Sequence, residues 1–424
     1  MAIAATIASR LCESTHMFSA LRYPQYKRFW FGNLFSIGAQ QMLFLAQGWL
    51  VYDLTGSALY LGYAGLVTAI PAILLNLAGG VLADRLDQRK VIMITQATTA
   101  ALIFTLATLT ALGWVEVWHV LVIAFFSGAL QAFNNPARQS IFPQLLDRKD
   151  LMNAISLNSM IWQGTRIIAP AIGGVLIAFV DTATVFYVCG FGALGMVIAA
   201  AGLKVEHQPR PRQEGVFTDL RIGLSFIRDN FLFAFLIGMT FFNSFFGQSG
   251  LTLMPVFAED VLDVGPSGLG FLFSAYGTGT FLGVLIASNL GNFEHKGLLI
   301  VLGATAFGGF LLLFAICPYY PLALLPLFLA GICNQAYIIS VQSILQLRVP
   351  DELRGRVMGV YGMTYNMGPL GALVAGGIAD AVSAQAAVAV GAIAIMAFAL
   401  GVALTRSEVR SLQVAAATPA SAGH

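Results

Sequence analysis

The sequence predicts an all-α membrane protein with twelve transmembrane helices in two pseudo-symmetric six-helix bundles. Three observations predict this fold: the composition, the spacing of the apolar runs and the placement of the basic residues. Of the 424 residues, 58% are hydrophobic and only 10% are charged, whereas soluble domains carry roughly 25% charged residues. A surface with so few charges is suited to contact with lipid rather than with water. We therefore expect most of the chain to lie in a bilayer.

Twelve apolar runs are long enough to cross a bilayer, which takes about 20 residues in each helix. Charged or turn-forming residues separate each run from the next. The runs lie near residues 29–52, 58–83, 91–113, 117–137, 152–179, 184–203, 231–258, 267–290, 297–317, 321–346, 354–380 and 384–404. This spacing predicts a lead-in (1–28), an N-terminal bundle (29–203), a central linker (204–230), a C-terminal bundle (231–404) and a tail (405–424).

Basic residues predict the orientation of the chain. All but one of the 22 lysine and arginine residues fall in the tails or in the loops after even-numbered runs, with Arg138 assigned to the loop after the fourth run. Loops rich in lysine and arginine stay on the cytoplasmic side of a membrane. We therefore expect both termini, the linker and these loops to be cytoplasmic.

The two halves of the chain show short internal matches. Gln139-Ser140-Ile141 ends the fourth run and Gln342-Ser343-Ile344 ends the tenth, while Leu61-Gly62 opens the second and Leu269-Gly270 opens the eighth. Each match is short, but together they indicate a parallel repeat of six helices plus six, as in transporters built from two bundles.

Amide side chains concentrate in the first, fourth, seventh and tenth runs. In the first run, Asn33, Gln40 and Gln47 are seven positions apart, so they share one helical face. Polar side chains inside a membrane mark a wet cavity or the hydrogen bonds that join helices, and both interpretations are open for each amide. We predict a substrate cavity that contains Asn33, Gln40, Gln47, Gln131, Asn134, Arg166, Asn243, Gln248, Asn334, Gln335 and Tyr365.

Arg166 is the one charge that the predicted spans place deep in the membrane. A buried arginine there attracts an anionic group of a substrate, takes part in coupling, or donates structurally to carbonyls of neighbouring helices. Proton-coupled carriers generally use an embedded carboxyl group whose pKa burial raises. In this sequence the acids lie near span ends, so proton coupling stays open. The candidates are Asp53, Glu259, Asp260, Asp263 and Asp380.

The segment between the second and third runs, from Gly80 to Lys90, resembles the signature loop of the major facilitator superfamily. In that family the loop latches the two halves in the outward-facing state. Asp87 stands where the family usually has a second glycine. The resemblance implies a gating loop that contains Gly80, Leu82, Asp84, Arg85, Arg89 and Lys90.

The fifth run carries a second resemblance, to the antiporter motif of drug exporters. Its residues would be Gly164, Pro170, Gly173 and Gly174, with Ala169 in place of the glycine that usually precedes the proline. Residues 46–57, 135–139, 153–159 and 349–357 are similar to the bacterial branch of transmembrane secretion effectors and drug or siderophore exporters. The resemblance implies a multi-pass protein of the bacterial inner membrane.

These features together favour a secondary active exporter of small amphipathic molecules that works by alternating access. Two alternatives are a lipid or lysophospholipid transporter of the same fold and a membrane sensor or scaffold that does not transport. An ATP-driven pump is not expected, because the sequence has no G-x-x-x-x-G-K-[ST] loop. An enzyme is not expected either, because the five histidines lie in loops or at ends and no H-E-x-x-H motif or nucleophile elbow occurs. We expect no cofactor, no metal and no nucleic acid, a monomer in contact with membrane lipid, and the proton as the candidate coupling ion.

Overall fold

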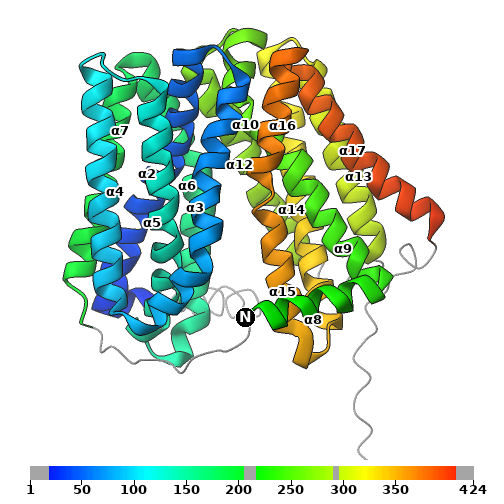
Figure 1. Ribbon diagram of the computed structural model, residues 1–424, viewed down its shortest axis with the longest axis horizontal. Helices are drawn as coiled ribbons and strands as arrows, with labels where there is room; N and C mark the ends of the chain where they lie inside the picture. Colours follow the sequence, from blue (N-terminus) through cyan, green and yellow to red (C-terminus); the bar gives the residue numbers. More distant parts are fainter. Residues whose placement is uncertain (1–18, 205–215, 290–295, 407–424) are drawn as a thin grey trace, which may run out of the picture. The chain divides into compact units, whose positions relative to one another are not determined.

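The computed structural model describes residues 19–204, 216–289 and 296–406, and at residues 76–85, 216–220 and 365 it describes the backbone alone. Helices make up nearly all of these ranges (Figure 1). Eleven of them are long and apolar enough to cross a membrane. The predicted all-α membrane fold is therefore confirmed in the part of the chain that is described.

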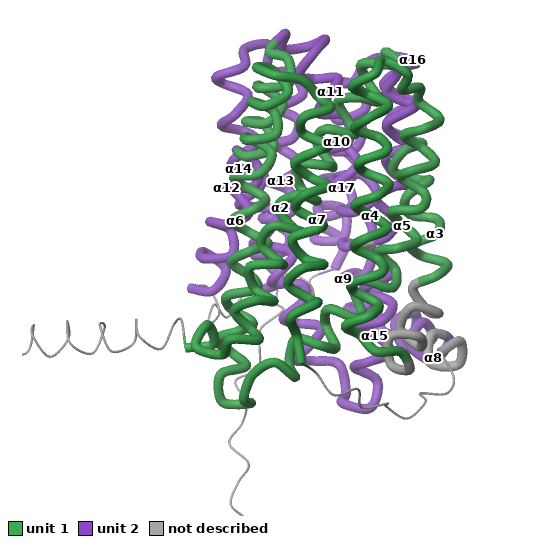
Figure 2. The backbone as a smooth tube through the Cα atoms, turned by 90° about the vertical axis from the view of Figure 1, so that its left-hand side faces the viewer, with its two compact units in different colours: residues 1–56, 63–212, 264–274 green, residues 57–62, 213–263, 275–424 purple. Residues whose placement is uncertain are grey.

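Chain contacts divide the protein into two compact units, coloured separately in Figure 2. Unit 1 comprises residues 1–56, 63–212 and 264–274. Its helices α2, α4, α5, α6 and α7 pack against one another. The elements of this half of the chain are η1 (Ser19–Arg22), α2 (Pro24–Thr55), α3 (Ala58–Arg85), α4 (Gln88–Ala111), α5 (Val117–Ile141), η2 (Phe142–Leu145), η3 (Arg148–Asp150), α6 (Leu151–Phe179) and α7 (Thr182–Ala201).

Unit 2 comprises residues 57–62, 213–263 and 275–424. Figure 1 draws its amphipathic helix α8 across the ends of α9 and α15, within the segment that the sequence predicted as a polar linker. The elements of this half are α8 (Val216–Asp229), α9 (Phe231–Phe242), the π-helix η4 (Asn243–Gln248), α10 (Ser249–Thr252), α11 (Met254–Val256), the π-helix η5 (Phe257–Val261), α12 (Gly265–Asn289), α13 (Lys296–Ile316), α14 (Tyr320–Arg348), α15 (Asp351–Tyr365), α16 (Gly368–Ala381) and α17 (Ala384–Thr405).

Two predicted spans are not regular helices. The eleventh, expected as one helix over 354–380, consists of α15 and α16, which are separated at Asn366 and Met367. Pro369 lies in the first turn of α16, where its missing N–H costs no hydrogen bond, so the chain begins a new helix there. The seventh span is divided by the two π-helical stretches η4 and η5.

Two short segments belong to the unit opposite to that of their sequence neighbours. The first turn of α3 lies in unit 2 against α16, where the Asp380 carboxylate accepts hydrogen bonds from the Ser57 hydroxyl and from the N–H groups of Ala58 (2.7 Å) and Leu59 (3.3 Å). Asp380 therefore supplies an N-terminal cap for a different helix. Conversely, residues 264–274, which include the first part of α12, pack in unit 1.

A buried apolar cluster near the start of α2 orients this helix in unit 1. Tyr26 and Phe29 pack with Ile92, Ile141 and other side chains from α4, α5, α6 and α7. The Tyr26 hydroxyl donates to the Ala154 carbonyl at 3.0 Å, so the buried phenol has a partner. This anchoring turns the next polar residues of α2 toward α4 and α5.

The end of the lead-in is tied to the segment between α5 and α6. The Tyr23 hydroxyl donates to Asp150 (2.8 Å) and Asp147 (2.9 Å), and Ser19 donates to Asp150 at 2.6 Å. Donation to Asp150, and next to Asp147, raises the pKa of Tyr23 above its usual value, because these carboxylates favour the protonated phenol. Residues 1–18 of the predicted lead-in lie outside the described residues.

Candidate functional site

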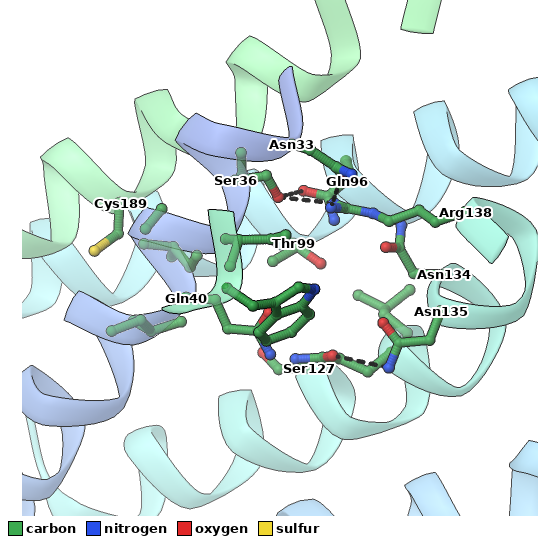
Figure 3. Close-up of a pocket in the computed structure, with 18 of the residues that line it drawn as sticks. Asn33, Ser36, Gln40, Gln96, Thr99, Ser127, Asn134, Asn135, Arg138 and Cys189 are labelled. Atoms are coloured by element: carbon green, nitrogen blue, oxygen red, sulfur yellow. Dashed lines mark hydrogen bonds between the residues drawn. The ribbon is translucent and has the colours of Figure 1, made fainter. Parts of the chain in front are cut away.

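Unit 1 contains a cavity of about 490 Å³ between α2, α4 and α5, with α6 and α7 contributing (Figure 3). Small-molecule sites commonly measure roughly 300–1,000 Å³. The lining combines an apolar part, which includes Phe29, Leu43, Ile103, Leu130 and Trp162, with a polar part. The polar members are Asn33, Ser36, Gln40, Gln96, Thr99, Ser127, Gln131, Asn134, Asn135, Arg138, Gln139 and Asn158.

Arg138 reaches across the cavity from α5 to α2. Its Nη1 donates to Asn33 Oδ1 at 2.6 Å, and its Nη2 donates to Ser36 Oγ at 2.7 Å. The Ser36 hydroxyl in turn donates to Gln96 Oε1 at 3.2 Å, so α2, α4 and α5 are joined through one chain of hydrogen bonds (Figure 3). The guanidinium is thus held in a fixed orientation by two neutral oxygen atoms.

Two buried amides, Asn33 and Asn134, form further hydrogen bonds between the helices around the cavity. Asn33 is 4% exposed and donates to Asn158 Oδ1 at 3.3 Å, which links α2 to α6. Asn134 is 5% exposed and donates to Thr95 Oγ1 at 2.6 Å, which links α5 to α4. Satisfied polar groups in an apolar interior fix the relative positions of the helices that carry them. Hydrogen bonds between side chains therefore join α2, α4, α5 and α6 around the cavity.

Of the six residues predicted for the cavity in the first half of the chain, four line it. These are Asn33, Gln40, Gln131 and Asn134. Gln47 lies farther along α2, and its buried Nε2 has no hydrogen-bond partner. Arg166 is exposed on α6 and does not line the cavity.

Arg138 is the cavity residue that the sequence analysis missed. The predicted fourth span ends near residue 137, which places Arg138 in a cytoplasmic loop and leaves Arg166 as the one deep charge. The loop assignment of Arg138 is wrong, because α5 continues through Pro136 to Ile141. Arg166 lies near the middle of α6 (Leu151–Phe179), so its position within a span agrees with the prediction. Proline is tolerated inside membrane helices when neighbouring helices satisfy the freed groups. The signal was the spacing of three and four residues that joins Gln131, Asn134 and Arg138 on one face.

In unit 2, the predicted amides form a compact network around Tyr276. Asn243, in the π-helix η4, donates to Asn334 Oδ1 at 2.6 Å, and Asn334 donates to the Tyr276 hydroxyl at 2.7 Å. Gln248 donates to the same hydroxyl at 3.4 Å. These contacts have the geometry of hydrogen bonds that join helices. Gln335 is half-buried on α14, and the side chain of Tyr365 lies outside the described residues.

The predicted gating loop spans the end of α3 and the start of α4. Gly80, Leu82, Asp84 and Arg85 belong to α3, and their side chains lie outside the described residues. Asp87 caps α4 by accepting from the N–H groups of Arg89 (3.0 Å) and Lys90 (3.4 Å), which explains an acid at the position of the family's glycine. The Arg89 guanidinium donates to the Ala201 carbonyl, the last residue of α7, at 2.6 Å, and Lys90 is exposed.

The antiporter-like motif contacts α12 through only part of its length. A Cβ placed on Gly174 would lie 2.3 Å from the Pro266 carbonyl oxygen, and one on Gly270 would lie 2.5 Å from that of Pro170. A Cβ on Gly173 would make an ordinary contact at 3.6 Å with Met42, and Gly164 faces open space. The motif therefore brings α6 and the first part of α12 into backbone contact in unit 1.

The membrane-spanning helices, the family model and the relatives together define a multi-pass membrane transporter of the major facilitator type and not an enzyme. The chain belongs to the transmembrane secretion effector family, whose sequence profile matches residues 15–422.

Similar proteins include the multidrug efflux pump Tap of Mycolicibacterium fortuitum, which is 26% identical over 350 residues, 80% of this chain and 85% of the relative. The enterobactin exporter EntS of Shigella flexneri is 25% identical over 362 residues, 84% of this chain and 85% of the relative. A crystal structure of the nucleoside transporter NupG (D323A mutant) has a TM-score of 0.73 and 16% identity, and the match covers 90% of this chain and 99% of that one. This structural likeness shows the fold.

Proposed function

We propose that this protein is a secondary active exporter of small amphipathic molecules that works by alternating access. The observation that carries the proposal is the unit 1 cavity, which pairs a polar network with an apolar wall in one space of suitable volume. Relatives that carry the names of a multidrug efflux pump and an enterobactin exporter support the direction of transport. A location in the bacterial inner membrane with both termini cytoplasmic belongs to the same proposal, supported by the distribution of basic residues.

Proton antiport is the proposed source of energy. The described lining of the cavity contains no aspartate or glutamate, so the proton site would lie elsewhere. The peripheral acids are the candidates, and Asp380 is the one whose carboxylate has a defined set of partners, at the start of α3. Protonation of that carboxylate would remove the charge that caps α3.

The test is transport in reconstituted vesicles that carry an imposed proton gradient. We expect gradient-dependent movement of at least one amphipathic dye or siderophore, and we expect a Thr99→Trp substitution to block it by filling the cavity. Thr105→Trp is the matched control, because Thr105 lies on the same helix, is exposed and does not line the cavity. Transport unchanged by Thr99→Trp would remove the cavity from the pathway.

The remaining outcomes separate the other functions. Movement of a lysolipid alone would favour a lipid transporter, and the absence of any gradient-driven movement across the panel would favour a protein that does not transport. If a probe equilibrates across the membrane at the same rate with and without the gradient, the protein is a passive facilitator and not an active transporter.

A further inference from the structure

We infer that the unit 1 cavity selects amphipathic organic anions, with the anionic oxygen bound by Arg138 and the apolar body placed against the aromatic and aliphatic wall. This inference rests on the proposed function, because it names the substrate class of the same cavity. Its first support is charge. Arg138 is the one charged residue in the described lining, and both of its hydrogen-bond acceptors, Asn33 Oδ1 and Ser36 Oγ, are neutral.

Among the side chains that the structure describes, none is a counter-ion for a cation in this position. Intramembrane charges generally pair with an opposite charge, because an uncompensated charge in a low-dielectric interior is costly. Arg138 donates its hydrogen bonds to neutral oxygen atoms alone, and the described lining holds no carboxylate that could neutralise it. A ligand that brings its own negative charge completes the pair, whereas a cationic ligand adds a like charge.

The guanidinium also retains capacity to bind a ligand. Arginine has five N–H donors, of which two are used by Asn33 and Ser36, and its planar fork matches a carboxylate. The Nε atom is buried without a partner, so the hydrogens left on the two Nη atoms are the ones that can face the cavity. Because α2 fixes the fork through two bonds, little side-chain freedom is lost when an anion binds.

The apolar part of the lining favours an apolar body in the ligand. Phe29, Leu43, Ile103, Leu130 and Trp162 form an apolar wall around the polar network. An inorganic anion would leave this wall in contact with water, and a hydrophobic amine would meet Arg138 as a like charge. An aromatic or aliphatic body that carries one carboxylate or phenolate satisfies both parts of the cavity.

The experiment measures equilibrium binding of three dansyl probes that share one fluorophore: dansylglycine (anionic), dansylglycinamide (neutral) and dansyl-ethylenediamine (cationic). The purified full-length protein in lipid nanodiscs is titrated by probe fluorescence, and its thermal unfolding is recorded with each probe. We expect the anion to bind about 10- to 100-fold more tightly than the amide, and the cation to bind most weakly. Only the anion should raise the unfolding temperature appreciably.

Variants assign the selectivity to one residue. Arg138→Gln should bind the acid and the amide alike, and Arg138→Lys should keep part of the preference because it keeps the charge but loses the fork. Arg148→Gln is the matched control, because Arg148 is exposed in η3, outside the cavity. If Arg138→Gln does not fold, the acid-over-amide affinity ratios of the wild type and of Arg138→Lys still test the inference.

The inference is overturned if the wild type binds dansylglycine and dansylglycinamide equally in the titration, or if the two probes have the same effect on its unfolding temperature. So does an acid preference that survives Arg138→Gln. Because binding is read without a gradient, this failure would leave active export standing. If the wild-type protein binds the anion but moves no probe in the vesicle transport assay, the proposed function is overturned instead.

Discussion

Asn33 Oδ1 accepts a hydrogen bond from Arg138 Nη1 at 2.6 Å across 105 positions of sequence. This contact joins the polar faces of α2 and α5, and Ser36 extends it to Gln96 on α4. It decides the electrostatics of the cavity, because the partner of the arginine is an amide and not an acid.

Replacing that amide by an acid should close the site to anions. Asn33→Asp places a carboxylate against the guanidinium, and the resulting ion pair competes with any anionic ligand. We expect the affinity for dansylglycine to fall about tenfold or more, measured by the same titration, while the unfolding temperature is kept or raised. Gln25→Glu, which adds a charge on α2 outside the cavity, should leave binding unchanged. Undiminished binding in Asn33→Asp would separate Arg138 from the ligand.

The antiporter-like motif should tolerate alanine at one glycine and not at its neighbour. Gly174→Ala forces a Cβ against the Pro266 carbonyl oxygen at 2.3 Å, so α6 and α12 must separate. We expect a loss of about 1–3 kcal/mol of stability and impaired transport. Gly173→Ala, with its nearest contact at 3.6 Å, should behave like the wild type. Thermal unfolding and vesicle transport of the two variants measure this difference, and equal behaviour would contradict the packing.

The cap that Asp380 gives to α3 should contribute to stability. Asp380→Ala removes the carboxylate that accepts from the Ser57 hydroxyl and from two N–H groups, and the loss of a typical cap costs about 1 kcal/mol. Differential scanning fluorimetry should show an unfolding temperature lower by a few degrees. Asp53→Ala, an exposed acid at the end of α2, is the control and should change little. If both variants unfold at the wild-type temperature, the cap is energetically neutral.

The two basic residues of the gating loop should differ in their effects. Arg89 donates to the C-terminal carbonyl of Ala201, where a cation also interacts favourably with the helix dipole, whereas Lys90 is exposed. We expect Arg89→Gln to lower stability by about 0.5–1.5 kcal/mol and Lys90→Gln to have a smaller effect. Thermal unfolding of both proteins is the measurement. A larger loss in Lys90→Gln would show that the loop acts through contacts other than this cap.

Several features of the protein could be predicted from local sequence patterns. The apolar runs predicted the helices because each transmembrane helix satisfies its own backbone hydrogen bonds, so its existence depends on nearby residues. The spacing of Asn33 and Gln40 predicted one polar face on α2, and both residues line the cavity. Two helix boundaries differ from the predicted ones: α5 continues past residue 137 to Ile141, and the eleventh span breaks before Pro369 into α15 and α16.

The sequence by itself determined the membrane fold, the exporter family and the helical faces that carry amides. Only the tertiary structure decided which of those faces meet: Arg138 rather than Arg166 lines the cavity, and Asn243 pairs with Asn334. Likewise, Gly174 rather than Gly164 contacts α12. The physical reason is that helical periodicity fixes the direction of a side chain relative to its own helix. The partner of that side chain depends on packing between helices far apart in sequence, which no local pattern encodes.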